Sequence, residues 1–98
     1  MVIVVKQIVS SCDTSSQGAE VYSKLRDSLR MNVAFTVDFI DIPNVTSSFV
    51  NTAFVPLLTE FSFSEVKARM SVINANRQVA SMLRDRMLKE SKRMRLAA

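Results

Sequence analysis

Residues 37–54 read VDFIDIPNVTSSFVNTAF, and the rest of the chain is arranged around this stretch. Residues 37–40 end a strand, a polar segment follows, and from Phe49 onward apolar positions recur at helical spacing. The hydroxyl cluster Thr46, Ser47 and Ser48 lies where the strand gives way to the helix. Ser and Thr are preferred at helix starts because their oxygens accept hydrogen bonds from unpaired backbone N–H groups. The sequence therefore predicts a helix cap at this junction.

Extended and helical patterns alternate on both sides of the junction. Two extended runs joined through a helix imply parallel strands with a right-handed crossover. The predicted fold class is a small α/β domain in βαβαβα order, with a mainly parallel short sheet and helices packed on it. The predicted elements are a strand over 2–9, a helix from Gly18 capped by Ser15 or Ser16, a strand over 33–40, a helix after Ser48, a polar connection over 62–67 with at most one helical turn, a strand over 69–73, and a final helix capped by Asn74 or Asn76.

Pro56 conflicts with the helix that is predicted after Ser48. Proline inside a helix removes one backbone hydrogen bond and costs about 3 kcal/mol unless a kink absorbs the strain. We therefore expect a bend or an interruption near Thr52–Pro56. The three predicted strands also leave sheet edges unpaired, so pairing of an edge in a homodimer is a further expectation.

Composition limits the classes of function. The chain has 98 residues, of which 48% are hydrophobic, and it contains one Gly, one Cys and no His. This predicts one domain over 1–90, no intramolecular disulfide, no metal site and no cofactor. The apolar first ten residues are too short to span a bilayer, so we expect a cytoplasmic protein that does not associate with a membrane.

Positive charge is concentrated at the C-terminal end of the chain. Residues 77–98 hold seven Lys and Arg against two acidic residues, which gives this segment a charge of +5, and we expect 91–98 to form a frayed basic tail. A solvated cationic helix face explains this charge without any ligand. The alternative is a nucleic-acid contact, for which aromatic stacking partners are missing. The residues of this alternative are Arg77, Arg84, Arg86, Lys89, Lys92 and Arg93.

The order of elements and three short segments resemble the STAS-like domain family, small relatives of bacterial anti-sigma-factor antagonists. The segments are Val33–Phe39 with Asp38, Val45–Phe49, and Ser71–Val79, and the resemblance covers roughly residues 17 to 88. In such antagonists an Asp-Ser-Ser-Gly motif opens the helix, and an ATP-binding anti-sigma kinase phosphorylates its second serine. By position, that serine is Ser48. Two positions depart from the motif, with Thr46 in place of the acid and Phe49 in place of the glycine.

The resemblance implies a non-catalytic regulatory domain that binds an ATP-binding anti-sigma or histidine-kinase-like protein in a bacterial switch. We expect phosphorylation of Ser48 or Ser47, although helix capping also accounts for this hydroxyl cluster. Catalysis is not expected, because the chain has no phosphate-binding glycine loop and no histidine that could serve as a base. The expected partner-binding residues are Asn44, Thr46, Ser47, Ser48 and Asn51.

Overall fold

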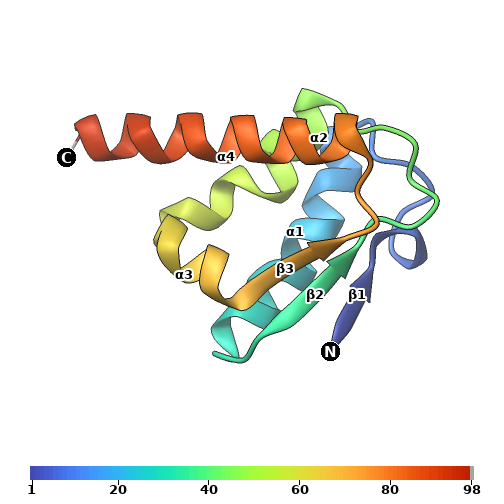
Figure 1. The fold of residues 1–98 in the computed structure, drawn as a ribbon, viewed down its shortest axis with the longest axis horizontal. Helices are drawn as coiled ribbons and strands as arrows, with labels where there is room; N and C mark the ends of the chain where they lie inside the picture. The colour runs from blue at the N-terminus through green and yellow to red at the C-terminus, as the bar shows by residue number, and fades with distance from the viewer. Residues whose placement is uncertain (98) are drawn as a thin grey trace.

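The computed structural model describes the backbone of residues 1–97 and the side chains of residues 1–94. Three strands and several helices alternate along the chain, which confirms the predicted small α/β class (Figure 1). None of the helices described is both long enough and apolar enough to cross a membrane. The elements are β1 (Val2–Val4), the 3-10 turn η1 (Val5–Gln7), α1 (Ser15–Arg30), β2 (Phe35–Asp38), α2 (Ser47–Ala53), the 3-10 turn η2 (Val55–Thr59), α3 (Phe63–Arg69), β3 (Met70–Ile73) and α4 (Arg77–Ala97).

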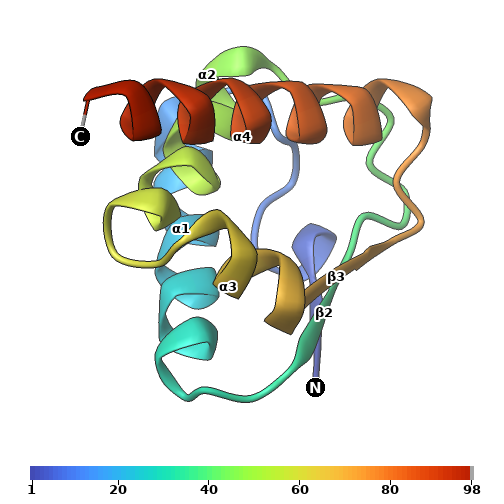
Figure 2. The same cartoon turned by 60° about the vertical axis from the view of Figure 1, so that its left-hand side comes forward.

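The sheet has the strand order β1-β2-β3, and both pairs of neighbours are parallel. Val37 at the centre of β2 pairs with Ile3 on one side and with Val72 on the other. Both crossovers step in the same direction across the sheet, and right-handed crossovers of that kind place their helices on one face. Figure 2 shows this arrangement, with the helices on one side of the strands and the other side open.

The core fills the space between the sheet and the helices. Val37, Phe39, Phe49 and Phe54 are all fully buried in one cluster, and the rings of Phe39 and Phe54 lie 6.1 Å apart between centroids. Gly18 lets α1 approach α2 closely, because a Cβ atom at this position would lie 2.8 Å from the backbone oxygen of Phe49. The start of α2 is therefore fixed against both the sheet and α1.

Several element boundaries differ from those that the sequence predicts. The first strand ends at Val4 instead of residue 9, because its last pairing partner is Asp38, where β2 itself ends. The cap of α1 is Thr14, so the expectation of Ser15 or Ser16 was wrong: Thr14 and Gln17 form a reciprocal capping box that starts the helix earlier. The predicted polar connection over 62–67 is wrong: α3, a seven-residue helix that starts after a capping box at Ser62, replaces it and runs on to Arg69, so β3 begins at Met70.

The expected interruption at Pro56 is present. Helix α2 ends at Ala53, and the chain continues as the 3-10 turn η2 with Pro56 at its start. A proline is tolerated in the first turn of a helix because its missing N–H would have no partner there. The apolar run after Ser48 is thus divided into two short elements.

Helix α4 starts after Asn76, whose Oδ1 accepts a hydrogen bond from the backbone N–H of Val79 at 2.9 Å. This identifies Asn76, of the two residues expected, as the capping residue. The helix lies across the other helices in Figures 1 and 2 and continues to Ala97. Residues 91–97 of the segment that we expected to fray are therefore helical, and residue 98 lies outside the described residues.

Candidate functional site

The junction between β2 and α2, residues 44–51, is called the serine corner below. Thr46 is the N-cap of α2, and its Oγ1 accepts a hydrogen bond from Phe49 N at 3.2 Å. The same hydroxyl donates to the backbone oxygen of Asp13 at 2.7 Å, and Thr46 N donates to the oxygen of Cys12 at 3.1 Å. One threonine thus starts the helix and joins the corner to the loop before α1.

The start of α4 holds the corner from the other side. The side-chain amide of Gln78 makes two hydrogen bonds with the backbone of Val45, accepting from its N–H and donating to its C=O, each at 2.9 Å. Asn76 Nδ2 donates to Pro43 O at 2.7 Å. Because Val45 is buried, these bonds satisfy backbone groups that water cannot reach. The backbone of the corner is therefore anchored at both of its flanks.

Ser47 and Ser48 lie in the first turn of α2, and both are exposed. Their hydroxyl groups make no hydrogen bond within the described part of the protein, since Thr46 provides the cap. Asn44 is also exposed, just before the helix. Asn51 lies one turn further along α2 and accepts a hydrogen bond at its Oδ1 from Arg86 Nε of α4 at 2.9 Å. The five expected partner-binding residues thus share one short surface segment.

The six cations of the predicted nucleic-acid alternative all lie on α4. Five of them are exposed, and Arg86 is half-buried. Arg86 contacts Asn51, and Arg93 pairs with Glu90, which lowers the pKa of the Glu90 carboxyl. Arg84 also lies 3.9 Å from Asp85, so protein groups contact three of the six side chains. At 100° per residue the other three, Arg77, Lys89 and Lys92, fall within about 120° of the helix circumference and therefore lie on one broad face of α4.

The carboxyl ends of β2 and β3 lie next to each other beside the corner, and side-chain hydrogen bonds connect them. Asp38 Oδ1 accepts hydrogen bonds from Ile40 N and from Asn74 Nδ2, both at 2.9 Å. Asp41 and Asn74 have positive φ angles of 61° and 57°, which Asp and Asn tolerate better than most residues. Asp38 and Asp41 therefore stabilise the turns that follow β2. Among the described residues no group of three acids, Cys or His is placed so that it could hold a metal ion.

Cys12 is buried beneath the corner with 1% of its surface exposed. Burial, followed by the negative charge of Asp13, raises the pKa of its thiol to about 11. The reactive thiolate is therefore scarce at neutral pH. Its contribution to the site is packing, together with the carbonyl that accepts from Thr46.

A family model described as a STAS-like domain of unknown function matches residues 17–80, which run from the first turn of α1 to the start of α4. This chain belongs to the STAS-like domain family. The matched segment includes the whole serine corner of the STAS-like domain, together with Asn76 and Gln78, whose hydrogen bonds to Pro43 and Val45 we call the clamp. No curated protein and no solved structure matches the chain.

The sequence did not reveal the contacts that fix the site of this STAS-like domain. Gln78 lies 33 residues from Val45, and Arg86 lies 35 residues from Asn51, so both pairs depend on how α4 packs against the rest of the domain.

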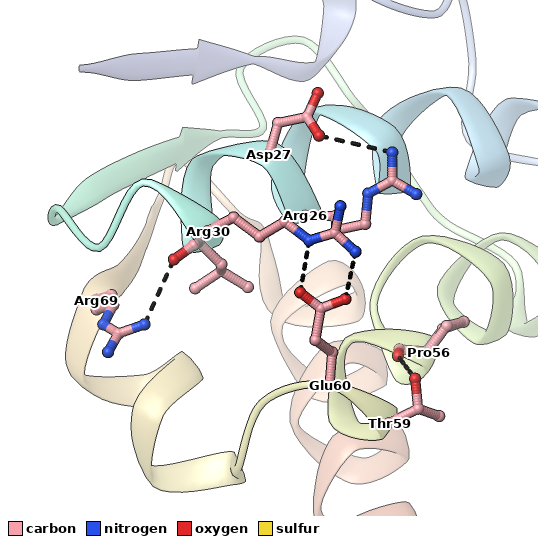
Figure 3. Close-up of polar contacts among 8 residues, drawn as sticks. Arg26, Asp27, Arg30, Pro56, Thr59, Glu60 and Arg69 are labelled. Carbon is pink, nitrogen blue, oxygen red and sulfur yellow. Dashed lines mark hydrogen bonds and ion pairs between the residues drawn. The ribbon is translucent and has the colours of Figure 1, made fainter.

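At the far end of α1, Arg30 makes a bidentate pair with Glu60, with both N···O distances at 2.6 Å (Figure 3). This pair joins α1 to the end of η2 and lowers the pKa of Glu60.

Arg69, the last residue of α3, contacts the same end of α1. Its Nη1 donates to the carbonyl of Leu29 at 3.4 Å (Figure 3). Its Nη2 lies 3.7 Å from Glu65 Oε2. These contacts lie far along α1 from the serine corner. They join α3 and the end of η2 to α1 within the helical layer.

Proposed function

We propose that this STAS-like domain is a non-catalytic regulatory domain of the cytoplasm that docks through the serine corner. The proposed partner is an ATP-binding anti-sigma or histidine-kinase-like protein. The observation that carries the proposal is that one of the three hydroxyl residues at the corner caps the helix and the other two do not. Thr46 supplies the cap, which leaves the exposed hydroxyls of Ser47 and Ser48 free for a partner or a kinase.

The proposal includes control by phosphorylation, with Ser48 as the site indicated by the resemblance and Ser47 as the second site. A phosphate would add a charge of about −1.5 to −2 to a surface that a partner meets as neutral hydroxyls. Ser47 and Asn51 are four residues apart and therefore lie on one face of α2. A phosphate on Ser47 would thus lie near Arg86, and a guanidinium binds phosphate more strongly than it binds a neutral amide.

The rigid mounting of the corner also supports docking. The Thr46 hydroxyl donates to the Asp13 carbonyl, and the side-chain amide of Gln78 both accepts from and donates to the backbone of Val45. The corner is thus held from two sides, so little freedom remains to be lost when a partner binds. Such preorganisation lowers the entropic cost of association. A modification of the hydroxyls would then change the chemistry of the surface without a change of fold.

The test is affinity capture from native lysate with the wild-type protein and with Ser48→Glu, followed by mass spectrometry. We expect the wild type to retain an ATP-binding kinase-like protein and Ser48→Glu to lose it. Ser64→Glu is the matched control, because Ser64 is also exposed and lies near the start of a helix, α3. The purified partner should transfer phosphate from ATP to the wild type and much less to Ser48→Ala.

Equal capture by wild type and Ser48→Glu would contradict docking at the corner. Native protein in which Ser47 and Ser48 are never modified, under conditions where the partner is active, would remove the phosphorylation part of the proposal. The docking part would remain if capture still depended on the corner.

A nucleic-acid-binding accessory role is the second candidate, and the length of α4 favours it. This 21-residue helix carries four exposed cations that make no hydrogen bond to a described side chain: Arg77, Arg84, Lys89 and Lys92. The test is a gel shift at about 50 mM and about 200 mM salt, with Lys89→Glu/Lys92→Glu as the variant. Binding that weakens with salt and is lost in the variant would favour this role over protein docking.

A further inference from the structure

A groove runs along the outer edge of β3, away from the serine corner. It has a volume of about 390 Å³, and its lining comes from α3, β3 and α4. Most of its wall is apolar, with Met70 and Val72 of β3 on one side and Leu83 and Met87 of α4 on another. We call this feature the edge groove.

The strand beside the groove has an unpaired edge. β3 is the last strand in the order β1-β2-β3, and Ile73 turns its carbonyl toward β2, where it accepts from Phe39 N at 3.0 Å. Successive peptide groups of a strand point to opposite sides, so Val72 turns its N–H and C=O outward. An edge of this kind is a template for another strand.

The side chains of β3 show what an added strand would meet. Met70 and Val72 both line the groove and are spaced two residues apart, as expected for one face of a strand. A neighbouring strand would lie about 4.8 Å away and would direct every second side chain onto the same face. Those side chains would enter the edge groove beneath α4. Val72 is 39% exposed there, so apolar partners would bury surface that now contacts water.

The charged residues of the groove wall all carry one sign. Lys67 of α3 and Arg84 of α4 line the groove, and no acidic side chain does. Lys67 makes no ion pair with a described residue, and Arg84 approaches only Asp85, at 3.9 Å, with both side chains mostly exposed. Such a pair contributes little, so both cations can meet a negatively charged ligand.

We propose that the edge groove binds an extended peptide segment of a partner protein, which adds beside β3 as a fourth strand. The side chains of this segment that enter the groove are apolar, and acidic residues of the segment meet Lys67 and Arg84. Backbone hydrogen bonds would supply affinity, and the groove would supply specificity, as in other cases of strand addition. This inference does not depend on the proposed role of the serine corner.

A second copy of this chain fits the groove less well. Pairing of two β3 edges would bring the Lys67 and Arg84 of each copy toward the same cations of the other. Like charges placed opposite each other oppose association. The expected homodimer through a sheet edge is therefore one outcome of the test, and the acidic peptide is the occupant that the charges favour.

The test is selection of displayed random peptides of about ten residues on the immobilised domain, a length sufficient to pair with a strand of ordinary length. We expect the selected peptides to alternate apolar residues and to carry acidic ones. The strongest peptide is then labelled and its affinity measured by fluorescence anisotropy. A copy that is N-methylated at alternate residues cannot donate the backbone hydrogen bonds, and we expect it to bind at least about tenfold more weakly.

The diagnostic variant is Lys67→Glu/Arg84→Glu, in which both exposed cations are reversed without a change in the core. We expect it to bind the selected peptide about tenfold more weakly than the wild type. The control is Lys6→Glu/Lys24→Glu, which changes the net charge equally at exposed positions outside the groove. Thermal melting of each variant separates a loss of binding from a loss of fold.

Three results would overturn the proposal. The first is a selection that yields no peptide, or peptides without acidic residues. The second is equal binding by the two double variants. The third is a wild-type dimer, seen by sedimentation, that Val72→Lys dissociates, since this would assign the edge to a second copy.

Discussion

Gly18→Ala tests how α1 and α2 are held together. A Cβ atom at position 18 would lie 2.8 Å from the backbone oxygen of Phe49, 2.8 Å from Thr52 Cβ and 3.3 Å from Ala53 N. Each of these atoms is part of the α2 backbone or directly attached to it, so a side-chain rotation cannot relieve the overlap. The two helices would have to separate, and the start of α2 would move with them.

Two opposing terms set the size of the effect. Alanine is favoured over glycine inside a helix by about 1 kcal/mol. Overpacking of a close contact costs about 1–3 kcal/mol, and contacts with atoms that cannot move aside belong at the upper end of that range. We therefore expect a net loss of about 2 kcal/mol in the free energy of unfolding. For a domain of this size, that corresponds to a fall of roughly 10 °C in Tm.

The assay is thermal and urea unfolding followed by circular dichroism. Ala19→Gly, at the exposed neighbouring position, calibrates the helix-propensity term, and we expect it to cost about 1 kcal/mol. In a Thr52→Gly background one of the two closest contacts is absent, so Gly18→Ala should cost less there than in the wild type. A Gly18→Ala protein as stable as the wild type, or more stable, would refute the close-approach argument.

Three further predictions concern single groups. Gln78→Ala leaves the buried N–H and C=O of Val45 unpaired, so it should cost about 1–3 kcal/mol and speed hydrogen exchange at the Val45 amide; unchanged exchange would show that the clamp is dispensable. The pKa of Glu60 is lowered by Arg30, so the stability from this pair is present above pH 4.5 and is lost as the pH falls through the lowered pKa. Glu60→Gln should therefore melt below the wild type at pH 7 and match it near the acid end of the titration, and a constant gap in Tm would contradict this. Cys12, with its pKa raised to about 11, should resist alkylation at pH 8 until urea unfolds the chain, whereas rapid native reaction would show that the thiol is accessible.

The elements that could be predicted are those whose signal is local. The alternating apolar residues of 33–40 and the hydroxyls before Phe49 identify the central strand and the capped helix, because hydrophobic period and capping depend on neighbours in sequence. Pro56 likewise indicated a break, since a proline cannot donate the backbone hydrogen bond of a helix interior in any tertiary context. The length of β1 could not be predicted, because a run of β-branched residues forms a strand only over the length that pairs with a neighbouring strand, here Val2–Val4 with β2.

The same distinction applies to the site. The serine corner and its hydroxyl cluster were found from sequence, because a helix start is a local feature; the structure adds that Ser47 and Ser48 are exposed. Gln78, Asp13 and Arg86, which hold it, were not found, because each contacts the corner across more than 30 residues of sequence. An isolated Gln or Arg on a helix carries no pattern that reveals such a contact.

The sequence by itself determined the α/β class, the alternation of three strands with the three main helices and the position of the corner, since these follow from period, caps and proline; it did not reveal α3. Tertiary structure decided which face of the sheet is covered, how closely α1 meets α2 at Gly18, and where β3 leaves its edge and groove open. The physical reason is that these features are distances between segments remote in the chain. Such distances are set by how the segments pack against one another, and local propensity does not encode them.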